Sequence, residues 1–207
     1  VGAVRRVSRM LYMARAFISS QESPNGDSFR NFLINLSASK LDADTQYTGY
    51  AQRITRKGPA PHEQEDWEGA SANNQKRLKD LTPTHFPIRF IESPKTGQFN
   101  FLDFDLYSNP NFARAMDKAR DTGSPALSKE VQMTPDFAGR NLRTFLLFLP
   151  IYRKGTSLRT PAERRSALEA FVFTVITAQN FFPNLHKDWP LSGIEIGVKI
   201  YEGREEN

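Results

Sequence analysis

The chain has 207 residues, enough for one large domain or two small ones with a proper hydrophobic core. Hydrophobic residues make up 39% and charged residues 25%, which is typical of a globular protein, so a disordered chain is not expected. The net charge of +5 would suit contact with nucleic acid or an anionic membrane, but the 28 Lys and Arg are scattered along the sequence. The absence of cysteine excludes disulfides and thiolate catalysis.

An amphipathic helix of about five turns is predicted at the start of the chain. Its apolar seam repeats at three-four spacing and consists of Val4, Val7, Leu11, Ala14 and Ile18. The seam can dock on the domain's own body or pair with its twin in a dimer, and the pattern does not decide between them. A second helix follows, with Asp27 as its expected cap and an apolar face formed by Phe29, Phe32, Leu33 and Leu36. We interpret residues 1–46 as a helical stalk.

No run of the sequence reaches the ~18 apolar residues that a membrane-spanning helix needs. No signal peptide precedes the first helix, and the chain begins in helical pattern without Met, which favours an excised fragment.

Strands are predicted from residue 85 onward, after a polar segment with a surface helix around Trp67. The first two, 85–91 and 98–107, are rich in Phe and Ile and are separated by a SPKTG turn. A helix follows, with Asn109 as its cap, Pro110 in its first turn, Phe112, Met116 and Ala119 facing inward, and Gly123 at its end.

The second half of the chain predicts further strands at 126–133, 141–153 and 166–177. A capping box of Thr160 and Glu163 precedes the last of them, and residues 193–201 alternate as one more strand. Because helices do not alternate regularly with these strands, the sequence predicts an α+β fold with an antiparallel sheet.

Residues that could carry chemistry are few. His62, His85 and His186 lie far apart in loop-like segments, so we expect surface histidines and no metal site. Asp103 and Asp105 stand two apart on an expected strand, which would place both on one face for acid–base work or a cation. The alternative for Asp105 is a carboxylate satisfied by a turn or a sheet edge. No catalytic motif is present, so we expect no enzymatic activity and no cofactor.

An ordered series of segments resembles the CHASE domain, the extracytoplasmic sensor of many bacterial receptor kinases and of plant cytokinin receptors. YTGYAQRI at 47–54 is similar to the family's opening motif, and HFPIRFIESP to its first strand. FDLYSNPNFARAMDKARDTGSPALSKEVQM is similar to the central strand–helix–strand, and FLLFLPIYRKGTSLRTPAERRSALEAFVF to the closing hairpin.

The resemblance implies a long stalk helix followed by two PAS-like modules with antiparallel sheets, usually in a homodimer. It places the stalk at 1–46 and the sensor core at 47–176, with the distal module at about 80–176. Residues 177–207 would supply a helix and a strand that complete the membrane-proximal module.

The resemblance also implies a ligand-binding set. Asp105 corresponds to the aspartate that binds the adenine edge of a cytokinin, and Leu127 would offer backbone groups and an apolar wall. The shared face of one strand would line the pocket with Phe145, Leu147 and Leu149, and the closing strand would add Phe171, Phe173 and Thr174. Phe173 and Thr174 stand where the plant receptors have small residues, so a bulky ring would shrink or reshape the cavity. For each apolar position, plain core packing is the alternative.

We therefore expect the periplasmic, ligand-binding sensor of an inner-membrane receptor, anchored by flanking transmembrane helices and signalling through its stalk. The expected parent is a bacterial sensor histidine kinase, and the expected ligand is a small molecule such as an adenine derivative. A cyclic-dinucleotide cyclase or phosphodiesterase is the alternative parent. A basic nucleic-acid-binding module is the alternative from another class, although we expect no nucleic-acid partner.

Overall fold

The computed structural model describes residues 2–38, 47–55, 84–93, 102–132 and 143–177. The helix expected around Trp67, the strand at 193–201 and all but the first residue of the segment 177–207 lie outside these ranges. The described elements, in chain order, are α1 (Gly2–Ser20), α2 (Gly26–Ala38), β1 (Tyr47–Gln52), β2 (Ile54–Thr55), β3 (Thr84–His85), β4 (Ile88–Glu92), η2 (Leu106–Ser108), α4 (Pro110–Thr122), β5 (Ala126–Leu127), β6 (Val131–Gln132), β7 (Arg143–Tyr152), α6 (Pro161–Ala167) and β8 (Leu168–Thr177).

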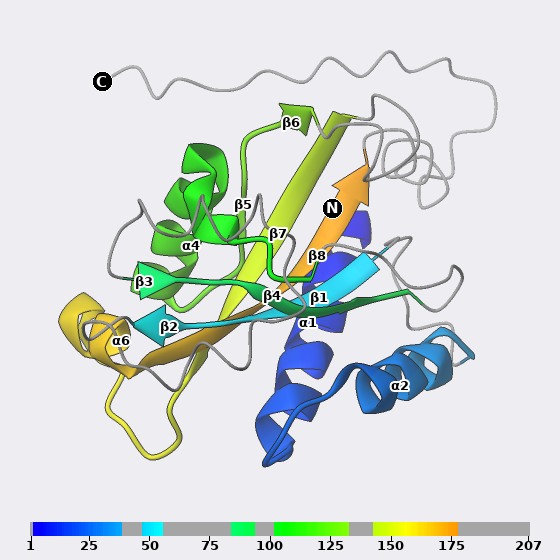
Figure 1. The fold of residues 1–207 in the computed structure, drawn as a ribbon, viewed down its shortest axis with the longest axis horizontal. Coiled ribbons are helices and arrows are strands. Elements are labelled where there is room, and N and C mark those ends of the chain that lie inside the picture. Colours follow the sequence, from blue (N-terminus) through cyan, green and yellow to red (C-terminus); the bar gives the residue numbers. More distant parts are fainter. Residues whose placement is uncertain (1, 39–46, 56–83, 94–101, 133–142, 178–207) are drawn as a thin grey trace.

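An antiparallel sheet forms the centre of the described structure (Figure 1). Its strand order is β4-β1-β8-β7-β5, and β6 pairs with β7 beside β5. A separate two-stranded ladder joins β2 and β3. The α+β prediction with an antiparallel sheet is therefore confirmed. The sheet takes in β1 as well as strands from the segment 80–176, and a second PAS-like module is not confirmed among the described residues.

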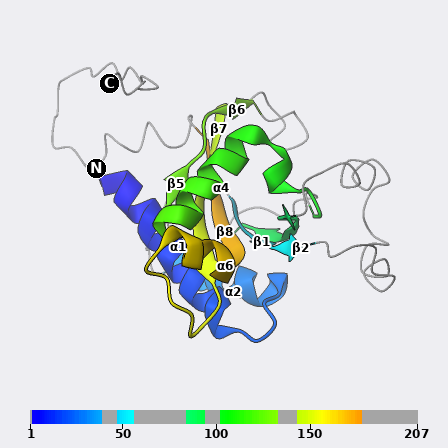
Figure 2. The same ribbon diagram turned by 90° about the vertical axis from the view of Figure 1, so that its left-hand side faces the viewer.

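Helices α1 and α2 cover one face of the sheet, opposite to α4 (Figure 2). The α1 seam packs into a buried cluster with β7 and β8, where its members Val7, Leu11, Ala14 and Ile18 are joined by Met10. The seam was expected to pack either on the domain's own body or against its twin in a dimer, and in the structure it packs on the domain's own sheet. The two helices therefore lie on the body of the domain, and a projecting stalk is not confirmed.

The start of α2 differs from the prediction. The backbone N–H of Ser28 donates to Oδ1 of Asn25 at 2.9 Å, so Asn25 is the capping residue and the expected cap at Asp27 is wrong. Asp27 lies inside the first turn, where its charge favours the helix N-terminus. Farther along, Arg30 Nε donates to Glu92 at 2.7 Å, which ties α2 to the edge strand β4.

Helix α4 covers the other face of the sheet and follows its prediction closely. Asn109 caps it, Pro110 begins it and Gly123 ends it at a φ of 71°, a left-handed conformation that glycine adopts without strain. The expected inward face is buried at Phe112, Met116 and Ala119. The capping box of Thr160 and Glu163 is also confirmed, and it begins α6.

The strand expected at 98–107 is wrong within its described residues, 102–107. Asp103 adopts a left-handed φ of 66° in a turn, Asp105 forms a single β-bridge with Pro87, and Leu106 begins the 3₁₀ helix η2. Aspartate side chains compete with a strand because they bond to nearby backbone N–H groups. The Asp105 carboxylate does this here, since it accepts from the backbone of Tyr107 two residues later.

Candidate functional site

Asp105 is buried, with 6% of its surface exposed, and both of its carboxylate oxygens have protein partners. Oδ1 accepts hydrogen bonds from the backbone N–H groups of Phe86, at 2.8 Å, and Tyr107, at 3.0 Å. Oδ2 lies 3.1 Å from Nδ1 of His85. These contacts join the β3–β4 corner to η2, so Asp105 stabilises the turn between them.

His85 is the partner that the sequence did not indicate. It lies on β3 with 4% of its surface exposed, so the expectation that it is a surface histidine is wrong. Phe86 packs edge-on against Phe171 next to it, which keeps this corner dry. A carboxylate bonded to Nδ1 fixes the orientation of an imidazole ring. The arrangement is thus a buried polar pair that holds two segments together.

The expected placement of Asp103 beside Asp105 on one strand face is wrong. Asp103 lies in the turn, where its backbone N–H donates to the carbonyl of Ile88 at 2.9 Å. Burial raises the pKa of its carboxyl group, and Arg89 partly offsets that rise. Asp103 and Asp105 therefore do not share the strand face that a two-carboxylate site would need.

Three predicted ligand-binding residues on β7 share one face, as expected, and that face lies against helices α1 and α2. Leu147 and Leu149 are buried in the cluster that these helices complete, and Phe145 packs at its margin. That the three residues line a ligand pocket stays a prediction.

Phe171 and Phe173 lie on the opposite face of the sheet, in the cluster under α4. Phe173 is fully buried, and Gly49 stands opposite it on β1. A Cβ at Gly49 would lie 2.5 Å from Cζ of the Phe173 ring, so the ring occupies the space that a side chain on β1 would need. The bulk of Phe173 is therefore accommodated by the glycine of the YTGY segment, and the ring fills this part of the core.

The last two residues of the predicted set are Thr174 and Leu127, which both pair with Leu147 of β7. The hydroxyl of Thr174 donates to the carbonyl of Tyr47 at 2.9 Å, and Thr174 also bonds Thr48, which contacts Met10 on α1. Leu127 pairs with Leu147 on the edge strand β5 and is 53% exposed. The predicted set is thus divided between the two faces of the sheet.

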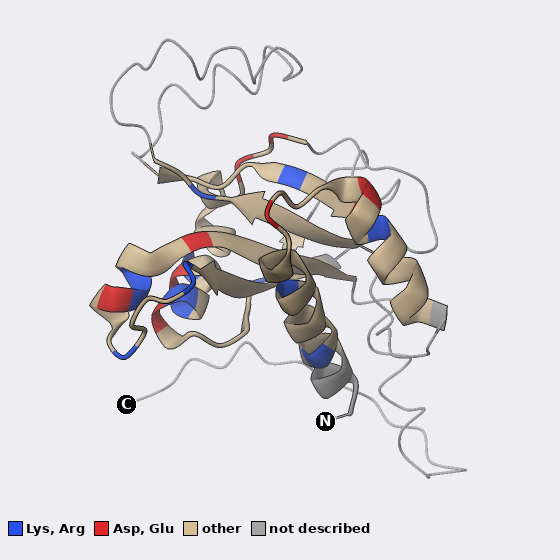
Figure 3. Ribbon diagram, turned by 90° about the horizontal axis from the view of Figure 1, so that it is seen from below, with Lys and Arg blue, Asp and Glu red and all other residues tan. Residues whose placement is uncertain are grey.

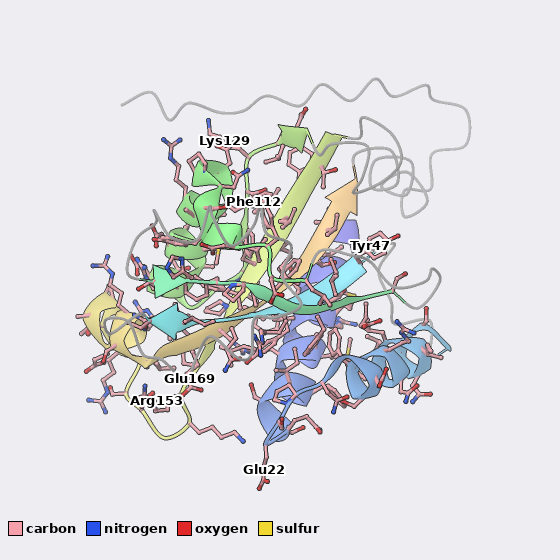
Figure 4. All side chains as sticks on the ribbon, viewed as in Figure 1. Glu22, Tyr47, Phe112, Lys129, Arg153 and Glu169 are labelled. Atoms are coloured by element: carbon pink, nitrogen blue, oxygen red, sulfur yellow. The ribbon has the colours of Figure 1, made fainter. Side chains whose placement is uncertain are left out.

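A pocket of about 480 Å³ lies elsewhere, where the end of α1 meets the end of the sheet. We call it the end pocket, and its lining residues are Ile18, Ser19, Gln21, Glu22, Pro24, Tyr50, Gln52, Arg53, Thr55, Ile151, Tyr152, Arg153, Lys154, Leu168 and Glu169. Figure 4 shows Glu22, Arg153 and Glu169 at this end of the molecule, coming from three separate segments. The volume falls in the range of ligand sites, about 300–1,000 Å³.

A β-bulge places one wall of the end pocket. Ile151 pairs with Ala170 and Tyr152 with Leu168, which leaves Glu169 as an extra residue in β8. Glu169 accepts from Arg153 Nε at 3.2 Å, across the exposed edge of the pocket.

Tyr50 on β1 adds a hydrogen-bond donor to the lining. Burial, and then the charge of Glu169, raise the pKa of its phenol, while Arg89 opposes the rise. Because the phenol keeps its proton at neutral pH, Tyr50 can donate to a ligand.

Part of this site could have been found in the sequence. Ile151 continues the alternation of Phe145, Leu147 and Leu149 to the end of β7, and Tyr50 and Gln52 share a face of β1 by the same period of two. No signal in the sequence marks the bulge at Glu169.

Neither a metal centre nor a membrane span emerges from the described residues. No group of three or more His, Cys, Asp or Glu among them could hold a metal ion. Of the helices that the structure describes, none combines the length and the apolar character that crossing a bilayer requires.

The family follows from a comparison with known protein families, since a model of the CHASE domain matches residues 22–207, nearly the whole chain. This chain belongs to the CHASE family. CHASE domains are extracytoplasmic, ligand-binding sensor modules of membrane signalling receptors. The match begins just after α1, so it covers α2, the sheet, α4 and α6. No curated protein matches this CHASE domain.

Proposed function

We propose that this CHASE domain binds a small molecule in the bacterial periplasm and controls a sensor histidine kinase in the inner membrane, to which flanking transmembrane helices connect it. The family match over residues 22–207 carries the proposal, and the end pocket supports it with a volume of about 480 Å³. A cyclic-dinucleotide cyclase or phosphodiesterase is the alternative output. The CHASE domain itself would bind and transmit without turning over a substrate.

Helix α1 offers a path from the end pocket to the far end of the domain. Ile18 and Ser19, near its C-terminal end, line the pocket beside Leu168 and Glu169 at the start of β8. In Figure 1 the helix runs from there toward the end of the sheet where β8 finishes. If α1 can take two positions relative to the sheet, a ligand shifts their populations only by binding one of the two states more tightly. We propose that the bound ligand favours one position of α1 and hence one arrangement of a homodimer.

The proposal is tested by thermal unfolding of residues 1–207 against a panel of amino acids, small carboxylic acids, short peptides and adenine derivatives. A ligand that binds the folded state raises the unfolding temperature, and the rise grows with the logarithm of the ratio of ligand concentration to Kd. We expect at least one class to do so, and the same compound to change the output of a receptor that carries this domain between its own membrane helices. A panel that leaves both readouts unchanged would contradict the proposal.

Adenine recognition by Asp105 stays a prediction. Both carboxylate oxygens already hold Phe86, Tyr107 and His85, so an adenine edge would have to share or displace these donors. Calorimetric titration with adenine derivatives checks it, since the prediction requires binding that depends on Asp105.

Nucleic-acid binding is less well supported than small-molecule binding. Seen from below, the described Lys and Arg are interspersed with Asp and Glu (Figure 3). A basic binding face would give oligonucleotide affinity that falls steeply with salt. A filter-binding titration at two salt concentrations measures this, and we expect no such affinity.

A further inference from the structure

We propose that the end pocket binds a small carboxylate with an apolar body, such as an aromatic acid or an amino acid. The inference rests on the proposed sensor function and deepens it by naming the class of ligand. It draws on three features of the described lining: an unbalanced positive charge, the phenol of Tyr50 as a neutral donor, and an apolar wall.

The charge of the lining favours an anion. Three of its side chains are basic and two are acidic, and Glu169 is already paired with Arg153. Arg53 uses one terminal nitrogen to bond the backbone carbonyls of Arg165 and Leu168, at 3.1 and 3.2 Å. Among the described residues it forms no ion pair, and its Nε is buried without a hydrogen-bond partner. A ligand carboxylate would supply the acceptor and the charge that Arg53 lacks.

Lys154 adds a second cation at the rim of the pocket. It lies exposed in the turn after β7, and Gly155, with a φ of 75°, completes that turn. An exposed ammonium contributes less than the half-buried guanidinium of Arg53 because solvent screens it more. Lys154 therefore suits a role in attracting and orienting an anion that Arg53 and the phenol of Tyr50 hold.

The remaining wall of the pocket suits the body of the ligand. Ile18 and Ile151 extend the buried cluster under α1 to the pocket, and Pro24 and Leu168 add to this apolar surface. Glu22, on the segment between α1 and α2, is exposed and also lines the pocket. It offers an acceptor for an ammonium group, which separates two sources of carboxylate: an amino acid would use Glu22, whereas a simple aromatic acid would not.

Calorimetric titration of residues 1–207 with three matched compounds tests the ligand class. Benzoate presents the carboxylate and apolar ring, benzamide removes the charge, and L-phenylalanine adds an ammonium group. We expect benzoate or phenylalanine to bind and benzamide to bind much more weakly. Binding of benzamide as tight as that of both acids would overturn the proposal, and so would the absence of binding by both acids.

Paired variants locate the site. Lys154→Ala should weaken acid binding by roughly fivefold, a loss in keeping with one partly screened charged contact. Lys129→Ala is the matched control, because Lys129 is also an exposed lysine but lies at the opposite end of the molecule in Figure 4. Glu22→Gln should weaken phenylalanine and leave benzoate unchanged. Equal losses in the two lysine variants, or none in either, would reject the end pocket as the site.

Covalent labelling gives an independent readout because the natural chain has no cysteine. Thr55→Cys places a single thiol in the pocket lining, and Lys129→Cys places one far from it. A saturating acid should slow thiol modification at position 55 and not at position 129. If another compound of the panel stabilises the domain while neither acid protects position 55, the inference fails and the sensor function stands. If no compound stabilises the domain or changes receptor output, the proposed function fails too.

Discussion

Asp105 joins the β3–β4 corner to η2, the region where the sequence-based prediction of a strand was wrong. Its carboxylate satisfies two backbone N–H groups, those of Phe86 and Tyr107, and the imidazole of His85 in an environment from which water is largely excluded. Removing one partner from a buried hydrogen-bond network leaves its donors without acceptors, which costs more than the bond itself contributes. If Asp105 has this structural role, its replacement should lower the free energy of unfolding.

Replacement of Asp105 by Ala is expected to lower the free energy of unfolding by about 3 kcal/mol, because three buried donors lose their acceptor. Asp105→Asn should cost less, since an amide oxygen can still accept from Phe86 and Tyr107. Urea unfolding followed by circular dichroism measures both changes. An alanine variant as stable as the natural chain would mean that the carboxylate is held for a ligand rather than for the fold.

The junction between α4 and α6 depends on one half-buried carboxylate and several arginines. Asp121, at the end of α4, accepts from Arg120 Nε at 2.7 Å and from the terminal nitrogen of Arg165 on α6 at 2.6 Å. Arg164 Nε donates to the backbone carbonyl of Asp121 at 2.7 Å. The bonds from Arg165, and then from Arg120, hold the pKa of the Asp121 carboxyl group well below its usual range.

A lowered carboxyl pKa stabilises the folded state at neutral pH, and the gain is lost as the pH falls below the ordinary value of 3.8. Asp121→Asn should therefore cost about 0.5–1 kcal/mol at pH 7, a small amount because solvent screens the pair. The difference from the natural chain should shrink as the pH approaches 3.

The same unfolding series on Glu22→Gln serves as the control for Asp121. Glu22 is an exposed carboxylate between α1 and α2 and lies outside this junction. A cost for Asp121→Asn that stays the same at pH 3 would show that its ion pairs do not contribute to stability.

Helices and strands were predicted well from the sequence where neighbouring residues determine them. The caps of Asn109 and Thr160 depend on a few neighbouring residues, and the structure has both. The strand expected through Asp105 failed because its carboxylate bonds the backbone of Tyr107 two residues later and also bonds Phe86 and His85, about twenty residues away. The bulge at Glu169 depends on the register of β7 against β8, which no single segment encodes.

The candidate site was harder to predict than the elements, because it depends on which face of the sheet each strand presents. A period of two correctly grouped Phe145, Leu147 and Leu149 on one face. It could not tell that α1 would cover that face while Phe173 lies on the other one, over Gly49. The end pocket joins residues as far apart in the chain as Ile18 and Glu169, so only the folded structure brings them together.

For the whole molecule, the position of α1 decides whether the first twenty residues are a stalk or part of the core. Leu11 is fully buried against the sheet, among Met10, Ala14 and Val172. Its neighbour Tyr12 is 41% exposed on the same helix. A helix that projected from the domain would make both positions nearly irrelevant to the unfolding of the sheet.

We expect Leu11→Ala to lower the free energy of unfolding by about 3 kcal/mol, because it leaves a cavity between α1 and the sheet. Tyr12→Ala, the control, should change it by less than about 1 kcal/mol, since an exposed side chain contributes little. A chain that begins at residue 22, where the family match starts, should unfold at lower urea and expose Leu147 and Leu149 to a hydrophobic dye. If the shortened chain and Leu11→Ala both keep the stability of the full chain, α1 is a stalk. The proposed signal path from the end pocket along this helix would then be wrong, and the signal would have to pass through the sheet.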